Sequence, residues 1–215
     1  MKTFTISAVF ALPFLTTAFP TSLISRDQAA VTINGFGLST TTITAADLKS
    51  VAPSTASCSG STTGQCVTAD QAAPAIADSF KKWGIVSFGS QAAIISTILF
   101  ESNNFQSNVG IGANASPGKG TRNMQSADNN AKYAQAVGVT GSTPDDIVSA
   151  LNKDVNLSFG SAAWFLATQC SMSIRDQLHG QETAGFSAYI TQCVNTGDLE
   201  KRTAIWNQLL ALKKW

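Results

Sequence analysis

Charged side chains are scarce in this sequence. Asp, Glu, Lys and Arg make up 13% of its 215 residues, and the 14 basic residues nearly balance the 13 acidic ones. A protein that binds nucleic acid typically carries a basic excess that is clustered on one face. A formal charge of +1 also provides no field that would steer the chain to an anionic surface. The composition therefore argues against nucleic acid as a partner.

Apolar runs long enough to span a membrane are missing too. One short apolar stretch lies near the N-terminus. A charged start, apolar residues 8–14 and small residues after them predict a secretory signal peptide over residues 1–18. The stretch is too short to span a bilayer, and prolines interrupt it. We expect a secreted, extracellular protein without membrane contact after cleavage, with residues 19–26 as a candidate propeptide. Removing both segments takes away Lys2, Arg26 and no acid, which leaves the chain nearly neutral.

Histidine and cysteine are rare, and both limit the chemistry. His179 is the one histidine, and no Gly-x-Ser-x-Gly segment accompanies it to suggest a hydrolase triad. Zinc is an alternative for the four cysteines, but their spacings fit zinc poorly, and we expect no metal and no cofactor. In a secreted chain they favour disulfides, with Cys58 paired to Cys66 and Cys170 paired to Cys193.

No internal repeat is visible, but the chain changes character along its length. Residues 27–67 are rich in Ser, Thr, Ala and Gly, and β-like pieces such as residues 31–33 indicate an irregular N-terminal segment. From residue 68 onward the patterns are helical. We therefore predict a single helical domain over residues 68–215, long enough to bury a core.

Helix caps and apolar spacing predict where the helices lie. Thr68–Gln71 fits a capping box for a helix that ends near Trp83. Thr143, followed by a proline and two acids, is another strong start. The other expected helices cover about residues 90–102, 129–137, 157–170, 184–194 and 198–212. Because strand patterns are few, the predicted fold class is mainly α.

One acidic residue directly follows an apolar run. Ile94, Ile98 and Glu101 are spaced i, i+4 and i+7, so they share one face of the expected helix. Desolvation at such a face favours the neutral carboxylic acid. Cleavage of a glycosidic bond requires such an acid, because the leaving oxygen must receive a proton. The alternative is a helix-terminal glutamate that points to water.

Four elements, in order along the chain, resemble the lysozyme-like superfamily, in particular goose-type lysozymes and soluble lytic transglycosylases. Glu101-Ser102 ends the expected helix, and Met124-Gln125 follows a loop rich in Gly, Asn and Ser. Asn156–Leu166 and Ala184–Tyr189 are similar to two later motifs of that family. The resemblance covers about residues 70–210 and extends to secreted fungal muramidases.

The resemblance implies a lysozyme-like catalytic domain with a small β or loop wall around Met124-Gln125. It implies a monomeric glycosidase that cleaves peptidoglycan between N-acetylmuramic acid and N-acetylglucosamine, with Glu101 as general acid. Hydrolysis or a lytic, anhydro-forming route, and inversion or retention, stay open. A chitin-type glycosidase and a non-catalytic cell-wall-binding effector are the alternatives. The residues implied to bind substrate are Ser102, Asn123, Met124, Gln125 and Tyr189.

The second carboxylate departs from the family pattern. Goose-type lysozymes have an Asp two residues after Met-Gln, whereas here Asp128 stands one residue later. If Asp128 faces the sugar, it is the catalytic group that positions water for inversion. If it turns outward, Glu101 acts with the N-acetyl group of the substrate. A third possibility is that Asp128 caps the helix that follows.

Overall fold

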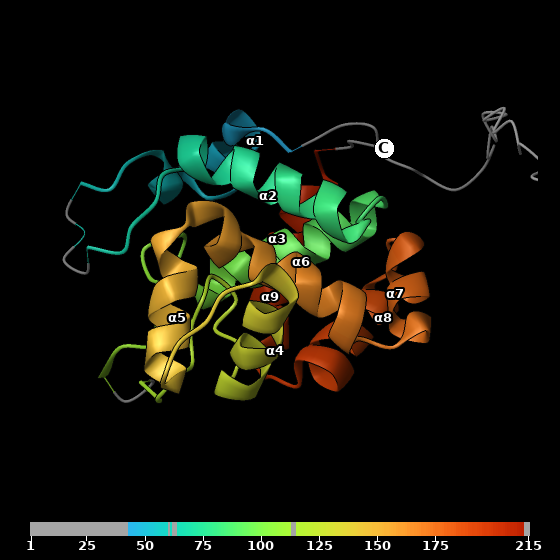
Figure 1. Cartoon of the computed structure of the whole chain (residues 1–215). Coiled ribbons are helices and arrows are strands. Elements are labelled where there is room, and N and C mark those ends of the chain that lie inside the picture. The colour runs from blue at the N-terminus through green and yellow to red at the C-terminus, as the bar shows by residue number, and fades with distance from the viewer. Residues whose placement is uncertain (1–42, 60, 62–63, 113–114, 213–215) are drawn as a thin grey trace, which may run out of the picture. The chain divides into compact units, whose positions relative to one another are not determined.

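A computed structural model of the chain describes residues 43–59, 61, 64–112 and 115–212 (Figure 1). The expected signal peptide, the candidate propeptide and the β-like residues 31–33 lie outside these ranges. So does the whole of a separate N-terminal unit, residues 1–34. Every element described below belongs to the second unit, Gly35–Trp215.

The described residues form a helical domain, which confirms the mainly α fold class. A 3-10 helix, η1 (Pro53–Ala56), follows the first α-helix, and a π-helix, η3 (Tyr189–Val194), continues the eighth. In this part of the chain, β structure is limited to two isolated bridges. The α-helices are α1 (Ala45–Val51), α2 (Ala69–Trp83), α3 (Phe88–Glu101), α4 (Ala127–Val137), α5 (Pro144–Lys153), α6 (Val155–Gln169), α7 (Met172–His179), α8 (Thr183–Ala188) and α9 (Leu199–Leu210).

The predicted caps start two of these helices. At α2, the Thr68 main-chain N–H donates to the Gln71 side chain at 3.1 Å, as a capping box requires. At α5, Thr143 and Asp146 exchange the equivalent pair of hydrogen bonds. Helix α2 ends at Gly84, whose φ of 68° lies in the left-handed region that favours glycine. These boundaries follow from local chemistry alone.

Two segments differ from the expectation. The predicted irregular segment 27–67 contains α1, whose Leu48 is fully buried where α1 packs against α2. The domain therefore includes residues well before 68. Helix α7 was not predicted, because its eight residues bury only Ile174 and Leu178, which is too little periodicity for a pattern to emerge.

Helix α3 runs through the centre of the domain. All of its residues from Phe88 to Leu99 are buried, and it packs against α6, α7 and α9. Figure 1 shows it behind α2 and α6. Its few polar side chains are buried as well, and those of Ser96 and Thr97 donate to main-chain oxygens. Glu101 is consequently the first charged side chain of α3, at the point where the helix leaves the core.

The close approach of α3 and α7 depends on Gly89. A Cβ atom at this position would lie 2.0 Å from the main-chain oxygen of Leu178. We expect Gly89→Ala to lower the free energy of unfolding by about 1–3 kcal/mol, because the two helices would have to separate. Thermal unfolding followed by circular dichroism measures this loss. Gly180→Ala is the matched control, since its Cβ would meet nothing nearer than 3.7 Å, and an unchanged Gly89→Ala melting temperature would contradict the prediction.

Two disulfides confirm the predicted pairing. Cys58 binds Cys66 before α2, and Cys170 at the end of α6 binds Cys193 in η3. All four sulfur atoms are thereby used, which rules out zinc thiolates. Such bonds are characteristic of oxidising compartments. Of the helices in the described part of the chain, none is both long and apolar enough to cross a membrane.

Candidate active site

Glu101 lies where two surface hollows meet. The inner hollow has a volume of about 490 Å³, and the middle hollow has about 410 Å³. Four residues line both, so the two hollows form one continuous groove: Glu101, Lys119, Met124 and Thr196. A groove that extends to both sides of a carboxyl group suits a chain-like ligand better than a small compact one.

Five of the predicted site residues share the inner hollow. They come from three separate parts of the chain: α3, the loop before α4, and η3. Because nothing in the sequence spacing requires these segments to meet, their convergence is a tertiary result. The five residues are Glu101, Asn123, Met124, Gln125 and Tyr189.

The Glu101 carboxylate is paired with an arginine that the sequence did not point to. Arg202 of α9 donates from a guanidinium nitrogen to Glu101 Oε1 at 2.5 Å. The Arg202 side chain is 2% exposed and that of Glu101 is 18% exposed. Arg202 is further held by the Phe100 ring, 4.0 Å from its guanidinium carbon, and by the main-chain oxygen of Gly197.

This pair changes the expected surroundings of the acid. The sequence predicted an apolar environment for Glu101, whereas its carboxylate faces a buried guanidinium at 2.5 Å. The pair also orients the group, because Oε1 is held by Arg202 while no hydrogen bond within the described residues reaches Oε2. Glu101 therefore presents one oxygen to the groove in a defined direction.

A left-handed turn follows Glu101 directly. Asn103, Asn104 and Phe105 have φ angles of 50°, 55° and 67°, which is unusual for three consecutive non-glycine residues. Ser102 holds this turn: it is fully buried, its hydroxyl donates to Ile98 O at 2.6 Å, and it accepts from the Phe105 N–H at 2.9 Å. Its predicted role in binding substrate is corrected, because the hydroxyl faces the turn and not the groove.

The opposite wall is the loop around Met124. Gly120 forms isolated bridges to both Val109 and Gln125, which provides the small β wall that was predicted. Met124 has a left-handed φ of 47° and is half-buried between the two hollows. Backbone strain of this kind persists where the surroundings enforce it, and it is common at functional sites.

Arg122 fastens this wall to the turn after Glu101. Its guanidinium is buried and donates to the main-chain oxygens of Phe105, Ser107 and Gln65, at 2.8, 3.1 and 2.6 Å. Burial lowers the pKa of Arg122 to about 10, so the group stays charged at neutral pH. Arg122 is thus a structural clamp, and its side chain is not part of the groove surface.

Two amides in the inner hollow are fixed by a hydrogen-bond chain. The Ser161 hydroxyl donates to Asn123 Oδ1 at 2.7 Å, and Asn123 donates to Gln125 Oε1 at 3.1 Å. Gln125 in turn donates to Asn130 at 2.8 Å. Since each amide nitrogen carries two hydrogens, Asn123 and Gln125 each keep one N–H beyond this chain. Held amides of this kind suit the acetamido and hydroxyl groups of sugars.

Tyr189 closes the floor of the inner hollow. It is 1% exposed, and burial raises its pKa to about 12, while a hydrogen bond with Thr97 and the charge of Arg202 oppose the rise. The phenol is therefore protonated at all physiological pH values. The expected helix over residues 184–194 is interrupted here, because α8 gives way to the π-helix η3. π-Helical turns are rare and often occur at functional sites.

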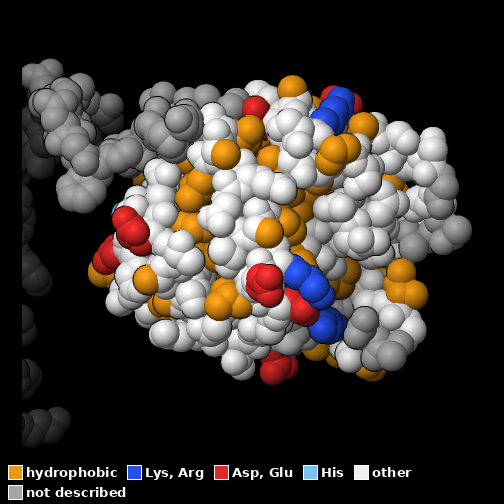
Figure 2. Space-filling view, turned by 180° about the vertical axis from the view of Figure 1, so that it is seen from behind, with side chains coloured by type: hydrophobic (Ala, Val, Ile, Leu, Met, Phe, Trp, Pro, Cys, Tyr) orange, Lys and Arg blue, Asp and Glu red, His pale blue; other side chains and the backbone are white. Residues whose placement is uncertain are grey.

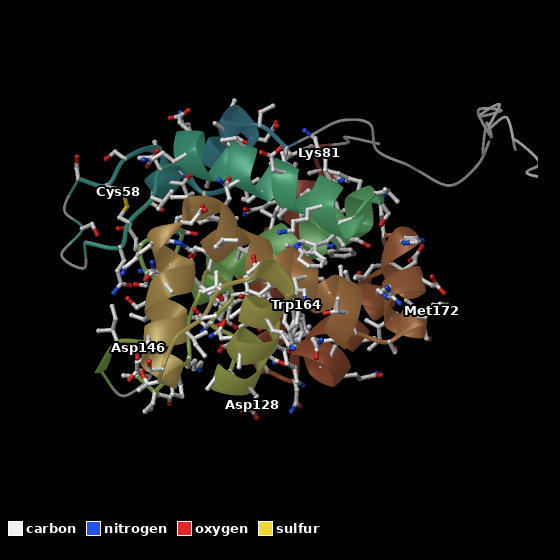
Figure 3. All side chains as sticks on the ribbon, viewed as in Figure 1. Cys58, Lys81, Asp128, Asp146, Trp164 and Met172 are labelled. Atoms are coloured by element: carbon white, nitrogen blue, oxygen red, sulfur yellow. A yellow bond between two sulfur atoms is a disulfide. The ribbon has the colours of Figure 1, made fainter. Side chains whose placement is uncertain are left out.

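Asp128 does not reach the groove. The helix it was expected to precede already begins at Ala127, with Ser126 as its cap, so Asp128 sits in the first turn of α4 and is not the cap. Its side chain is exposed and lines neither hollow. Figure 3 shows it at the lower end of α4, away from the other helices. Asp128 stands one residue beyond its counterpart in the family pattern, and one residue turns a side chain by about 100° around a helix. This position gives no support to the expected catalytic role.

A different acid lines the same groove as Glu101. Asp198 lines the middle hollow together with Glu101 and Arg202, and Lys201 is its ion-pair partner at 3.0 Å. It occupies the cap position of α9 with a left-handed φ of 56°. No sequence pattern pointed to Asp198. It is 97 positions away from Glu101 and lies outside the four elements that resemble the lysozyme-like superfamily. A Gly-Asp pair directly before a helix was the one signal that could have marked it.

Charged side chains are sparse on one face of the molecule. Most of the face in Figure 2 is uncharged; both signs meet in two places, and other acidic groups stand alone. Within the described residues, no group of three or more His, Cys, Asp or Glu side chains is placed to hold a metal ion.

Comparison with known proteins identifies one similar sequence. A bifunctional dioxygenase (DOX)-epoxy alcohol synthase (EAS) of Fusarium oxysporum (strain Fo5176) is 34% identical over 146 residues. The match covers 61% of this chain and 11% of that protein, so the chain spans about a tenth of its relative's length. No family model matches the chain, and no solved structure matches it.

Proposed function

We propose that this protein is a secreted glycosidase that cleaves peptidoglycan between N-acetylmuramic acid and N-acetylglucosamine. The observation that carries the proposal is the shared inner hollow, in which Glu101 meets Met124, Gln125 and Tyr189. The same residues belong to elements whose order along the chain resembles the lysozyme-like superfamily. The proposal does not draw on the activity named for the Fusarium protein, since the match covers only 11% of that protein.

In the proposed reaction, Glu101 is the general acid. With Oε1 held by Arg202, a proton on Oε2 is transferred to the glycosidic oxygen as the bond between that oxygen and the anomeric carbon breaks. Tyr189, which keeps its own proton, supports the floor beneath the reacting sugar.

Asp198 is the candidate for the second carboxylate. An inverting cleavage requires a carboxylate that accepts a proton from the attacking water on the far side of the sugar. Among the described residues, Asp198 is the one acid that lines either hollow besides Glu101. Its carboxylate is paired with Lys201 at 3.0 Å and is 52% exposed, so that water can reach it.

Substitution of the two aspartates separates these assignments. We expect Asp198→Asn to reduce the rate of wall lysis by about 10²-fold, within the range for loss of a general base. Asparagine tolerates the left-handed backbone at this position, so the cap of α9 should persist. Asp128→Asn is the matched control and should keep the wild-type rate. Measured initial rates in the reverse order would return the role to Asp128.

The products of wall digestion test the function itself. Purified bacterial walls incubated with the protein should release fragments with reducing N-acetylmuramic acid ends, identified by mass spectrometry. Anhydro ends would indicate the lytic route on the same bond. Release from chitin but not from walls would favour the chitin-type alternative, and no release from either would favour a non-catalytic wall-binding protein.

A further inference from the structure

A third hollow continues the groove away from Glu101. This outer hollow has a volume of about 630 Å³ and is the largest of the three. It shares Val109, Gly110 and Lys119 with the middle hollow. The three hollows therefore form one groove, in which the outer hollow is next to the proposed reaction site but not part of it.

One face of helix α5 forms a wall of the outer hollow. Asp145, Val148, Ser149, Asn152 and Lys153 line it, with the i, i+3, i+4, i+7 and i+8 spacing of a single helix face. The loop on the other side is held in place, since the Asn152 side chain donates to Asn108 O at 3.0 Å. The Gly118 N–H also donates to Asp145 at 2.6 Å. The outer hollow is thus a formed feature of the fold.

Lys119 stands at the junction of all three hollows. It lines each of them and is half-buried, and within the described residues its ammonium group has neither an ion pair nor a hydrogen bond. Lys153 at the far end of the outer hollow also has no ion-pair partner there. Asp145 is the one acid that lines this hollow, and it already accepts from Gly118. The outer hollow consequently has a cationic excess that is not neutralised by the protein.

We propose that the outer hollow binds a carboxylate-bearing branch of the glycan, with Lys119 as the residue that recognises the carboxylate. This inference rests on the proposed glycosidase function and specifies its substrate class. A chitin chain is uncharged, whereas muramic acid carries a lactyl group that ends in a carboxylate or in a peptide with carboxylates of its own. Lys119 therefore selects muramic acid-containing chains over chitin.

Three small ligands test this without any cleavage. N-acetylglucosaminyl-N-acetylmuramic acid, the same disaccharide carrying its peptide, and chitobiose all have two sugars, and the first two lack the bond that the protein is proposed to cut. We expect NMR titration of the wild type to give at least about tenfold tighter binding for one charged ligand than for chitobiose, or about 1.4 kcal/mol. The ligand that binds tighter of the two charged forms identifies whether the lactyl or the peptide carboxylate is bound.

Three variants assign the preference to Lys119. Lys119→Gln should remove the preference and leave chitobiose binding unchanged, while Lys119→Arg should retain most of it because the charge remains. Lys132→Gln is the matched control, since Lys132 is exposed on α4 and lines none of the hollows. Melting temperatures of all three establish that they are folded.

The inference is overturned if the wild type binds the three ligands equally or binds none of them. It is also overturned if Lys119→Gln keeps the preference or weakens all three ligands alike. These outcomes are distinct from failure of the proposed function. A protein that digests walls and chitin without preference remains a glycosidase, whereas one that digests neither but prefers the charged ligands retains the Lys119 site.

Discussion

Replacing Glu101 with glutamine is expected to slow lysis of bacterial walls by about 10²-fold or more, because the glycosidic oxygen then receives no proton from the protein. Glutamine has nearly the same shape as glutamate and can still accept the hydrogen bond from Arg202, so the groove should keep its form. Turbidity loss of a wall suspension measures the effect. A Glu101→Gln protein that lyses walls at the wild-type rate would show that Glu101 is not the acid.

The same substitution should also destabilise the protein. Arg202 is almost fully buried, and the loss of its negative partner leaves an uncompensated charge in the interior. We expect the free energy of unfolding to fall by about 1–3 kcal/mol, since a hydrogen bond to glutamine remains. Rates should therefore be compared well below the lower melting temperature.

Replacing Arg202 with methionine is expected to slow lysis of bacterial walls by about tenfold, because Glu101 is no longer oriented and a misplaced acid is inefficient. Initial rates of turbidity loss measure the effect.

Two further variants separate orientation from stability. Arg202→Lys keeps the positive charge without the planar fork, so it should recover only part of the rate that Arg202→Met loses. The Glu101→Gln/Arg202→Met double variant should be more stable than Glu101→Gln alone, because no unpaired charge is left buried. If Arg202→Met lyses walls at the full wild-type rate, Arg202 serves only to pack α9 against α3.

Local chemistry was enough to determine much of the fold. The caps at Thr68 and Thr143, the glycine after α2 and the apolar run of α3 all predict structure within a few neighbouring residues. The disulfide pairing was equally accessible, because each pair encloses a short segment. Helix α7 was missed, since its two buried positions leave no clear period, and α1 was missed within a segment of low complexity.

The candidate site could be predicted in part. Glu101, Met124, Gln125 and Tyr189 belong to ordered motifs, and the structure brings them to one hollow. Ser102 was misassigned, because sequence order does not tell whether a hydroxyl faces a groove or its own turn. Asp128 was expected at the groove, but a helix rotates each added residue by about 100°, which is enough to turn a side chain outward.

By itself, the sequence determined a mainly α domain, two disulfides and an acid at the end of a buried helix, because each depends on residues close together in the chain or on composition. Only the tertiary structure decided what faces that acid. Arg202 and Asp198 arrive from the last helix, and Lys119 arrives from a loop whose spacing from α5 gives no hint of contact. Such pairings depend on how α3, α5 and α9 pack, and packing brings together residues that no local pattern relates.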